Sequence, residues 1–309
     1  MVDLDDTNTI YVKEEEEGLR IDKLLSMRYD QKSRTYFQYL IENECVLLNG
    51  KKIKKRITPK KGDEIEIFFI LTKEISLEPQ DIKLNIIYED SDVIAINKPP
   101  NMVVHPAPGN WKDTFVNALL YHCKNISTDQ DNLRPGIVHR LDKDTSGILL
   151  AAKNKDAHRK LIEQFSSREI KKEYLAVCFG SPINQLIDSP IGRHKTRRKE
   201  MTVKTDGKKA ITEIENLYQK DGISIILAKP KTGRTHQIRI HLKHVSSPII
   251  GDETYGSYKI NKKFNAKRQM LHAFKIKFMH PTKNISIELT APLPLDFQEF
   301  SYLFDKIKI

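Results

Sequence analysis

GIVHRLDKDTSGILLAAK, residues 136–153, places a run of charged side chains and one histidine between two short apolar segments. The apolar segments are typical of strands, so the polar residues form a loop between them. Two carboxylates of this loop, Asp142 and Asp144, stand next to the cations Arg140 and Lys143. Positive charge beside a carboxylate favours its ionised form, and an ionised aspartate can act as a nucleophile or a base. Spacing alone favours the simpler interpretation, a solvated turn.

Short strands and a few helices surround this stretch on both sides. Apolar patterns predict strands at 84–98 (two strands joined by a turn), 173–180, 210–219, 222–230, 273–280 and 285–292. Apolar spacing of three and four residues predicts helices at 113–123, 155–168 and 235–245. Mostly short strands with interleaved helices indicate an α+β fold with a mixed, largely antiparallel β-sheet. We expect this domain to comprise residues 83–309.

A separate module is predicted before this domain, because the charge of the chain changes sign early in the sequence. Residues 1–19 are rich in Asp and Glu and are expected to be an acidic extension, whereas residues 20–69 are basic. Two helical segments in the module are followed by Asn49–Gly50, a typical hairpin turn, and by an alternating strand. Ser33 stands where it can cap the second helix. Weak periodicity makes residues 70–82 a linker.

Excess positive charge predicts a polyanionic partner. Lys and Arg outnumber Asp and Glu by 52 to 41, a net charge of +11, which favours nucleic acid over a membrane surface. The acidic start is unlike a signal peptide and no apolar run could span a bilayer, so we expect a cytoplasmic protein. The alternative for the basic module is a solvated face without a ligand. The cations expected to contact phosphates are Arg34, Lys51, Lys52, Lys54, Lys55 and Arg56.

Several other chemistries lack their sequence signals. No Gly-x-Gly-x-x-Gly is present, and GDETYGSY, residues 251–258, has Ser257 where a phosphate-binding loop needs lysine. His236, His241 and His244 stand close together, but no His-Glu-x-x-His or Cys-x-x-Cys motif accompanies them. The Gly-x-Ser-x-Gly turn of serine hydrolases is also missing from the sequence. We therefore expect no cofactor and no metal, and carboxylate chemistry remains.

Four blocks of sequence carry the most information about function. They are INKPPNMVVHPAPGN (96–110), RPGIVHRLDKDTSGILLAAK with KKEYLAVCFG (134–153, 171–180), PKTGRTHQIRIHL with PIIGDETYG (230–242, 248–256), and RQMLHAFKIKFMHP with APLPLD (268–281, 291–296). In order and spacing these blocks resemble the RluA family of RNA pseudouridine synthases, and in particular its RluD-like branch. The basic module resembles the RNA-binding domain of the ribosomal protein S-four type. The resemblance implies the pseudouridine synthase fold and an RNA substrate.

The reaction implied is an isomerisation in which the bond from ribose to the uracil nitrogen breaks and a bond to ring carbon five forms. The resemblance assigns the catalytic role to Asp142, as nucleophile or as base, and a structural role to Asp144. Arg234 would pair with Asp142 and keep it ionised, and Tyr174 would lie against the target base and transfer a proton. Arg140 would help to displace the target nucleotide. Taken alone, Tyr174 is interpreted as a core tyrosine and Arg234 as a phosphate contact.

Further RNA contacts are expected beside these groups. His139 belongs to the catalytic loop and is expected to contact the substrate. The basic run GRHKTRRK is expected to clamp phosphates through Arg193, Lys195, Arg197 and Arg198. A charged loop without bound RNA is the alternative interpretation of this run.

The branch that the chain resembles implies a particular substrate, a subunit-interface stem-loop of 23S ribosomal RNA, used free or within assembling particles. Three alternatives stay open: another ribosomal RNA site, transfer RNA, or a catalytically idle RNA-binding assembly factor. A monomer is expected.

Overall fold

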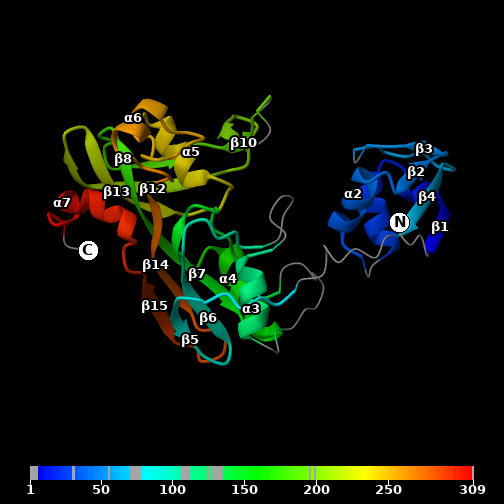
Figure 1. The fold of residues 1–309 in the computed structure, drawn as a ribbon, viewed down its shortest axis with the longest axis horizontal. Helices are drawn as coiled ribbons and strands as arrows, with labels where there is room; N and C mark the ends of the chain where they lie inside the picture. The colour runs from blue at the N-terminus through cyan, green and yellow to red at the C-terminus, as the bar shows by residue number, and fades with distance from the viewer. Residues whose placement is uncertain are drawn as a thin grey trace. The chain divides into compact units, whose positions relative to one another are not determined.

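The computed structural model describes residues 6–29, 32–54, 56–69, 78–105, 112–123, 126, 135–194, 196–197 and 200–307. These residues separate into two compact units, one within 6–69 and the other within 78–307 (Figure 1). The end of the predicted linker, residues 78–82, belongs to the second unit, and the rest of it lies outside the described residues. Within the described ranges, no helix has both the length and the apolar character needed to cross a membrane.

The first unit is a four-stranded antiparallel sheet with two helices. This arrangement matches the one predicted for the basic module, except that the first strand was not predicted. Its elements are β1 (Asp6–Tyr11), η1 (Glu14–Glu16), α1 (Ile21–Arg28), α2 (Arg34–Glu42), β2 (Val46–Leu48), β3 (Lys51–Lys52) and β4 (Glu64–Phe69), with sheet order β1-β4-β2-β3. Asn49 and Gly50 form the hairpin turn with φ of 51° and 70°. The Oγ of Ser33 accepts a hydrogen bond of 3.2 Å from the backbone N–H of Tyr36 and caps α2, as predicted.

The acidic segment before the module contributes to its fold, which the sequence analysis did not predict. In β1, Ile10 lies opposite Ile65 of β4, and Val12 is buried. Glu16 forms an ion pair with Arg28 of α1. The apolar alternation around Ile10 is short and adjoins a run of glutamates. For this reason the segment was interpreted as an acidic extension and not as a strand. The first unit therefore begins before residue 20.

The second unit contains a mixed sheet of nine strands, which confirms the predicted fold class. Its strands are β5 (Ile86–Glu89), β6 (Val93–Lys98), β7 (Ser146–Ala152), β8 (Lys171–Phe179), β9 (Gln185–Asp188), β12 (Ile211–Lys220), β13 (Ile223–Pro230), β14 (Leu271–Met279) and β15 (Ser286–Thr290). They follow the order β5-β6-β7-β14-β8-β13-β12-β9, with β15 paired to β14. The pair β7–β14 is parallel and all the other neighbours are antiparallel.

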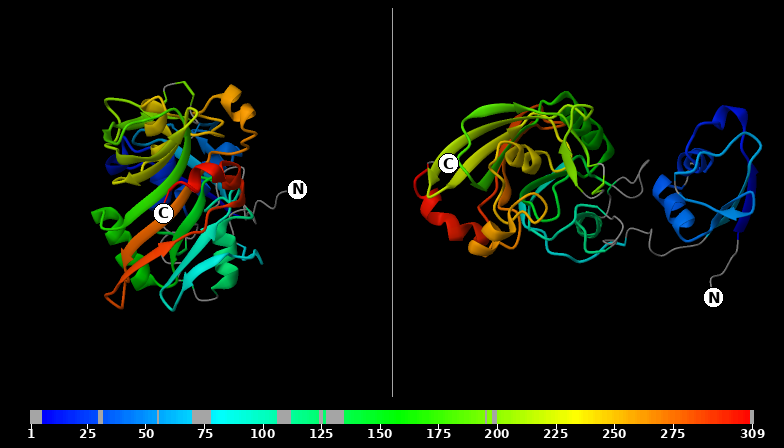
Figure 2. Two further views of the ribbon diagram at one scale, coloured as in Figure 1. Left: turned by 90° about the vertical axis from the view of Figure 1, so that its left-hand side faces the viewer. Right: turned by 90° about the horizontal axis from the view of Figure 1, so that it is seen from above.

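Helices cover the two halves of this sheet (Figures 1 and 2). They are α3 (Phe115–His122), α4 (Lys155–Ser167), α5 (Gln237–His244), α6 (Tyr258–Lys263), η3 (Leu295–Phe300) and α7 (Ser301–Phe304); a small hairpin is formed by β10 (Ile191–Arg193) and β11 (Met201–Val203). Side chains of α5, η3 and α7 share a core with β8, β12 and β13, whereas α3 packs on β6 and β7. The predicted helices at 113–123, 155–168 and 235–245 are confirmed.

The loop that contains Asp142 leads into β7, a strand at the centre of the sheet. Every residue of β7 is buried, and this strand lies beside β14 in the middle of the sheet order. Gly147 has φ of +106°, and a Cβ on it would lie 2.2 Å from the carbonyl oxygen of Ala273. Only glycine permits this close approach of the two strands. The tight contact fixes where the preceding loop, with Asp142, leaves the sheet.

Candidate active site

Two buried cations hold the backbone of the loop around Asp142. The Nζ of Lys98, at the end of β6, donates to the carbonyl oxygen of Lys143 at 2.9 Å, and also to those of Pro99 at 2.8 Å and Met102 at 3.0 Å. The side chain of Lys98 is fully buried. Three carbonyl oxygens match the three N–H groups of an ammonium. Lys98 therefore ties the loop to the segment that follows β6.

Arg268, just before β14, is the second cation of this support. Its Nη1 donates to the carbonyl oxygen of Asp144 at 2.9 Å, and its Nη2 donates to the Oγ of Ser146 at 3.2 Å. Asp296 holds the same guanidinium with two hydrogen bonds. The backbone N–H of Thr145 donates to the carbonyl oxygen of Asp142 itself. The backbones of Lys143 and Asp144, the two residues that follow Asp142, are thus held in place. This restricts the movement of the Asp142 carboxylate.

Arg239, in the first turns of α5, is the ion-pair partner of Asp142. Its Nη1 lies 3.1 Å from Oδ2 of Asp142, and its Nε and Nη2 donate to Asp252 at 2.6 and 2.9 Å. Burial opposes the charged form, but the carboxylates of Asp252 and Asp142 raise the pKa of Arg239. The guanidinium is therefore permanently charged. It presents a fixed positive group to the carboxylate of Asp142.

The predicted ion pair between Arg234 and Asp142 is wrong. The Nε of Arg234 donates instead to the carbonyl oxygen of Lys209 at 3.0 Å. Arg234 precedes the start of α5 and follows the extended chain of β13, whereas Arg239 lies on the buried face of the helix. Both arginines occur in the block TGRTHQIR. Burial of Arg239 on its helix was the signal that could have identified it as the partner of Asp142, because a buried arginine needs carboxylate partners.

His236 also lies near the carboxylate of Asp142. Its Nε2 is 4.0 Å from Oδ2 of Asp142, and its Nδ1 is 2.8 Å from the hydroxyl of Tyr255. That hydroxyl already accepts a hydrogen bond from the backbone N–H of Met201. It can donate its proton to Nδ1, which assigns the proton of His236 to Nε2, facing Asp142. Burial lowers the pKa of His236, although the charge of Asp142 opposes this shift. The sequence analysis singled out His236 only as part of a histidine cluster and missed this contact.

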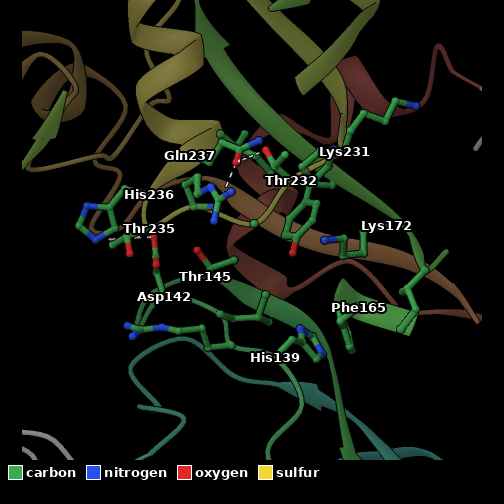
Figure 3. A pocket seen from close by; sticks show the side chains of 18 of the residues that line it. His139, Asp142, Thr145, Phe165, Lys172, Lys231, Thr232, Thr235, His236 and Gln237 are labelled. Atoms are coloured by element: carbon green, nitrogen blue, oxygen red, sulfur yellow. Dashed lines mark hydrogen bonds and ion pairs between the residues drawn. The ribbon is translucent and has the colours of Figure 1, made fainter. Parts of the chain in front are cut away.

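A pocket of about 420 Å³ brings the predicted site residues together (Figure 3). Asp142, Arg140 and His139 line it from the loop, Tyr174 from β8 and Arg234 from the segment before α5. This volume lies in the range of small-molecule sites. The structure therefore assembles all five residues at one cavity, although Arg234 contacts a backbone carbonyl there and not Asp142.

Two of these residues are kept neutral by the pocket. Burial and the charge of Asp142 raise the pKa of Tyr174, so its phenol keeps its proton. Burial and Lys172 lower the pKa of His139 to about 3. The Nε2 of His139 accepts a hydrogen bond from the backbone N–H of Leu150, and its ring stacks on Phe165 at 4.8 Å. His139 therefore builds the pocket wall as a neutral group.

The predicted phosphate contacts that belong to the described residues lie outside this pocket. Arg197 contacts Glu200 at 3.2 Å and His194 at 3.1 Å, and Arg193 ends β10. In the first unit, Arg34 pairs with the buried Asp22 at 3.0 Å. Lys52 pairs with Glu44, and Lys51, Lys54 and Arg56 are exposed. Lys55, Lys195 and Arg198 lie outside the described residues.

Comparisons with known proteins identify proteins that are similar to this chain. Residues 92–244 match the family model described as RNA pseudouridylate synthase. The chain is 40% identical to "Uncharacterized RNA pseudouridine synthase YlyB" of Bacillus subtilis, over 94% of this chain and 95% of that protein. It is 39% identical to "Ribosomal large subunit pseudouridine synthase D" of Escherichia coli O6:H1, over 94% and 92% of the two chains.

A solved structure has a similar fold. The structure of "Human RNA Pseudouridylate Synthase Domain Containing 1" superposes with a TM-score of 0.55 and 30% sequence identity, and covers 69% of this chain and 84% of that one.

Proposed function

Because this chain belongs to the RNA pseudouridylate synthase family, of the RluA type, it is an isomerase that forms pseudouridine in RNA, and we propose that its substrate is large-subunit ribosomal RNA. The observation that carries the proposal is the similarity to large-subunit pseudouridine synthases over more than nine-tenths of both chains. Coverage of that extent includes most of the basic first unit as well as the catalytic unit. Within the RNA, we propose a stem-loop at the subunit interface as the target.

The reaction begins with cleavage of the bond between C1′ of ribose and N1 of uracil, whose electron pair leaves with the base. The sugar becomes electron-poor, and the carboxylate of Asp142 either bonds to C1′ or removes a proton from the sugar. The uracil rotates, C5 bonds to C1′ as the intermediate breaks down, C5 loses its proton and N1 gains one. The product is an isomer of the substrate, so no other reactant is consumed.

The ion pair with Arg239 orients the carboxylate of Asp142. The contact of 3.1 Å between Nη1 of Arg239 and Oδ2 of Asp142 leaves Oδ1 available to the sugar. The backbone contacts made by Lys98 and Arg268 hold the loop without reorganisation during the reaction. We propose that the neutral phenol of Tyr174 lies against the base and exchanges a proton with it.

A paired or stacked uridine must leave the RNA stack to reach this pocket, at a cost of a few kcal/mol. The exposed guanidinium of Arg140 lies on the pocket lining beside Asp142. From this position it can occupy the space that the flipped nucleotide leaves. The exposed cations of the first unit are suited to hold the surrounding phosphates.

The substrate proposal is tested with three unmodified RNAs made by transcription: large-subunit ribosomal RNA, small-subunit ribosomal RNA and a pool of transfer RNAs. Pseudouridine is mapped by carbodiimide-dependent stops of reverse transcription. We expect stops in the large-subunit RNA at sub-stoichiometric enzyme, clustered in one stem-loop. Stops only in transfer RNA would replace the proposed substrate, and binding of large-subunit RNA without stops in any RNA would favour an idle assembly factor.

A further inference from the structure

Lys172 is a cation in the pocket to which the mechanism above gives no role. It lies on β8 two residues before Tyr174, and residues two apart on a strand point to the same face. Both side chains line the pocket, and Figure 3 shows the Lys172 side chain extending into it from the side opposite Asp142 in that view. Lys172 is half-buried, and burial lowers the pKa of its amine.

Among the described residues, the ammonium of Lys172 has no anionic partner. In the parts of the chain that the structure describes, it forms no ion pair and no hydrogen bond, and its Nζ lies 5.7 Å from the centroid of the Phe165 ring. The lining of the same pocket includes the apolar residues Val138 and Ile170. A charge held in such surroundings without a partner destabilises the free protein, and perturbed, unpaired charges of this kind concentrate at functional sites.

The other cations of the pocket differ from Lys172. Lys231 pairs with Glu213 at 2.8 Å, and Arg239 is held by two carboxylates. Arg140 and Arg168 are exposed, which suits contact with hydrated RNA phosphates. Lys172 is farther from solvent than these two and lies among groups that fit a planar base. Its position therefore points to the uracil ring and not to the phosphate backbone.

Cleavage of the glycosidic bond creates the negative charge that matches this cation. The electron pair of the C1′–N1 bond leaves with the uracil and is delocalised over N1, O2 and O4. We propose that the ammonium of Lys172 binds a carbonyl oxygen of the departing uracil and stabilises its negative charge during cleavage and rotation. This inference rests on the proposed function, because it assumes that Asp142 is at the sugar while the base lies toward Tyr174 and Phe165.

The test compares wild-type protein with Lys172→Met under single-turnover conditions at saturating enzyme, on uridine RNA and on the same RNA made with 5-fluorouridine. Fluorine withdraws electrons and stabilises the uracil anion, so the reaction of 5-fluorouridine depends less on the protein cation. We expect the rate of uridine consumption to fall about 100-fold, and that of 5-fluorouridine only about 10-fold. Lys172→Arg, which keeps the charge, is expected to recover part of the loss.

Lys171→Met is the matched control, because Lys171 is exposed and lies on the opposite face of the same strand. We expect its rates to stay within about 3-fold of wild type. An equal loss for uridine and 5-fluorouridine in Lys172→Met would overturn the proposal. Weaker RNA binding with an unchanged rate would also overturn it, and would make Lys172 a phosphate contact.

Thermal unfolding of the free protein gives a second readout that requires no activity. Removal of an unpaired, half-buried charge should leave Tm of Lys172→Met equal to or above that of wild type. A lower Tm would indicate that Lys172 is retained for packing and would contradict the inference. Failure of the proposed function is distinguishable, because wild-type protein would then consume neither uridine nor 5-fluorouridine in large-subunit RNA, while the Tm comparison would still stand.

Discussion

The catalytic loop and the basic first unit use positive charge in opposite ways. Around Asp142, the cations Lys98, Arg239 and Arg268 are buried and satisfied by carbonyl and carboxylate oxygens of the protein itself. In the first unit, Lys51 and Lys54 are exposed. Buried, satisfied cations fix the geometry of a reacting group, whereas exposed ones remain available to a polyanion. The two regions should therefore respond to mutation in different kinetic parameters.

The largest effect on stability and on the reaction rate is expected from Arg239→Met. It removes the partner of Asp142 and leaves the buried Asp252 without its guanidinium. We expect a loss of about 3–5 kcal/mol in the free energy of unfolding, and a fall of about 10³-fold in the single-turnover rate. Chemical denaturation measures the first quantity, and a pseudouridine formation assay measures the second.

The double variant Arg239→Met/Asp252→Asn separates stability from catalysis. The second substitution removes the carboxylate that Arg239→Met leaves buried without a cation, so much of the lost stability should return. The rate should stay low, because Asp142 still lacks its guanidinium partner. Recovery of the rate together with stability would show that Arg239 acts only through folding.

Lys98→Met tests the support of the loop backbone. Three carbonyl oxygens lose their donor, so we expect a loss of about 3 kcal/mol in stability. We also expect a single-turnover rate reduced about 100-fold, with little change in RNA affinity. Lys143→Met is the matched control, because only the backbone carbonyl of Lys143 takes part in this contact and its side chain is exposed. Equal rates in Lys98→Met and wild type would refute the idea that this clamp positions Asp142.

The triple variant Lys51→Gln/Lys54→Gln/Arg56→Gln tests the other region. We expect RNA affinity to fall about 10-fold at moderate salt, and the slope of log affinity against log salt to become shallower by roughly 2. The single-turnover rate at saturating protein should match wild type, because these side chains belong to the first unit. A lower rate at saturation, with an unchanged salt slope, would contradict the proposed separation of roles.

Ser33→Ala is expected to have the smallest effect. It removes the cap of α2 and should cost about 1 kcal/mol of stability in the first unit. Hydrogen exchange should increase in residues 34–42 and not in the catalytic unit. Uniform changes in both units would mean that they unfold as one cooperative body.

The sequence predicted the fold class, most strands, the capped helix and the loop of Asp142, because these depend on local periodicity and on motifs that stand in one segment. It missed β1, whose short apolar alternation adjoins a run of glutamates. From the sequence, Arg234 and not Arg239 was predicted as the ion-pair partner of Asp142. That choice depends on which arginine lies on the buried face of α5, and burial is decided by packing against distant strands. Lys98 and Arg268 were missed for the same reason: the backbone carbonyls that they bind in the Asp142 loop lie 45 and 124 residues away.

The most direct test of the account is the effect of Asp142→Asn on pseudouridine formation in unmodified large-subunit ribosomal RNA. Asparagine keeps the shape of the side chain and removes the charge that faces Arg239 and the sugar. The control is Asp144→Asn, which removes a carboxylate from the same loop and leaves the backbone contact of Asp144 with Arg268 in place. We predict no detectable pseudouridine with Asp142→Asn, unchanged RNA binding, and activity with Asp144→Asn within about 10-fold of wild type. Pseudouridine formed by Asp142→Asn at the wild-type rate would contradict the assignment of the reaction to Asp142.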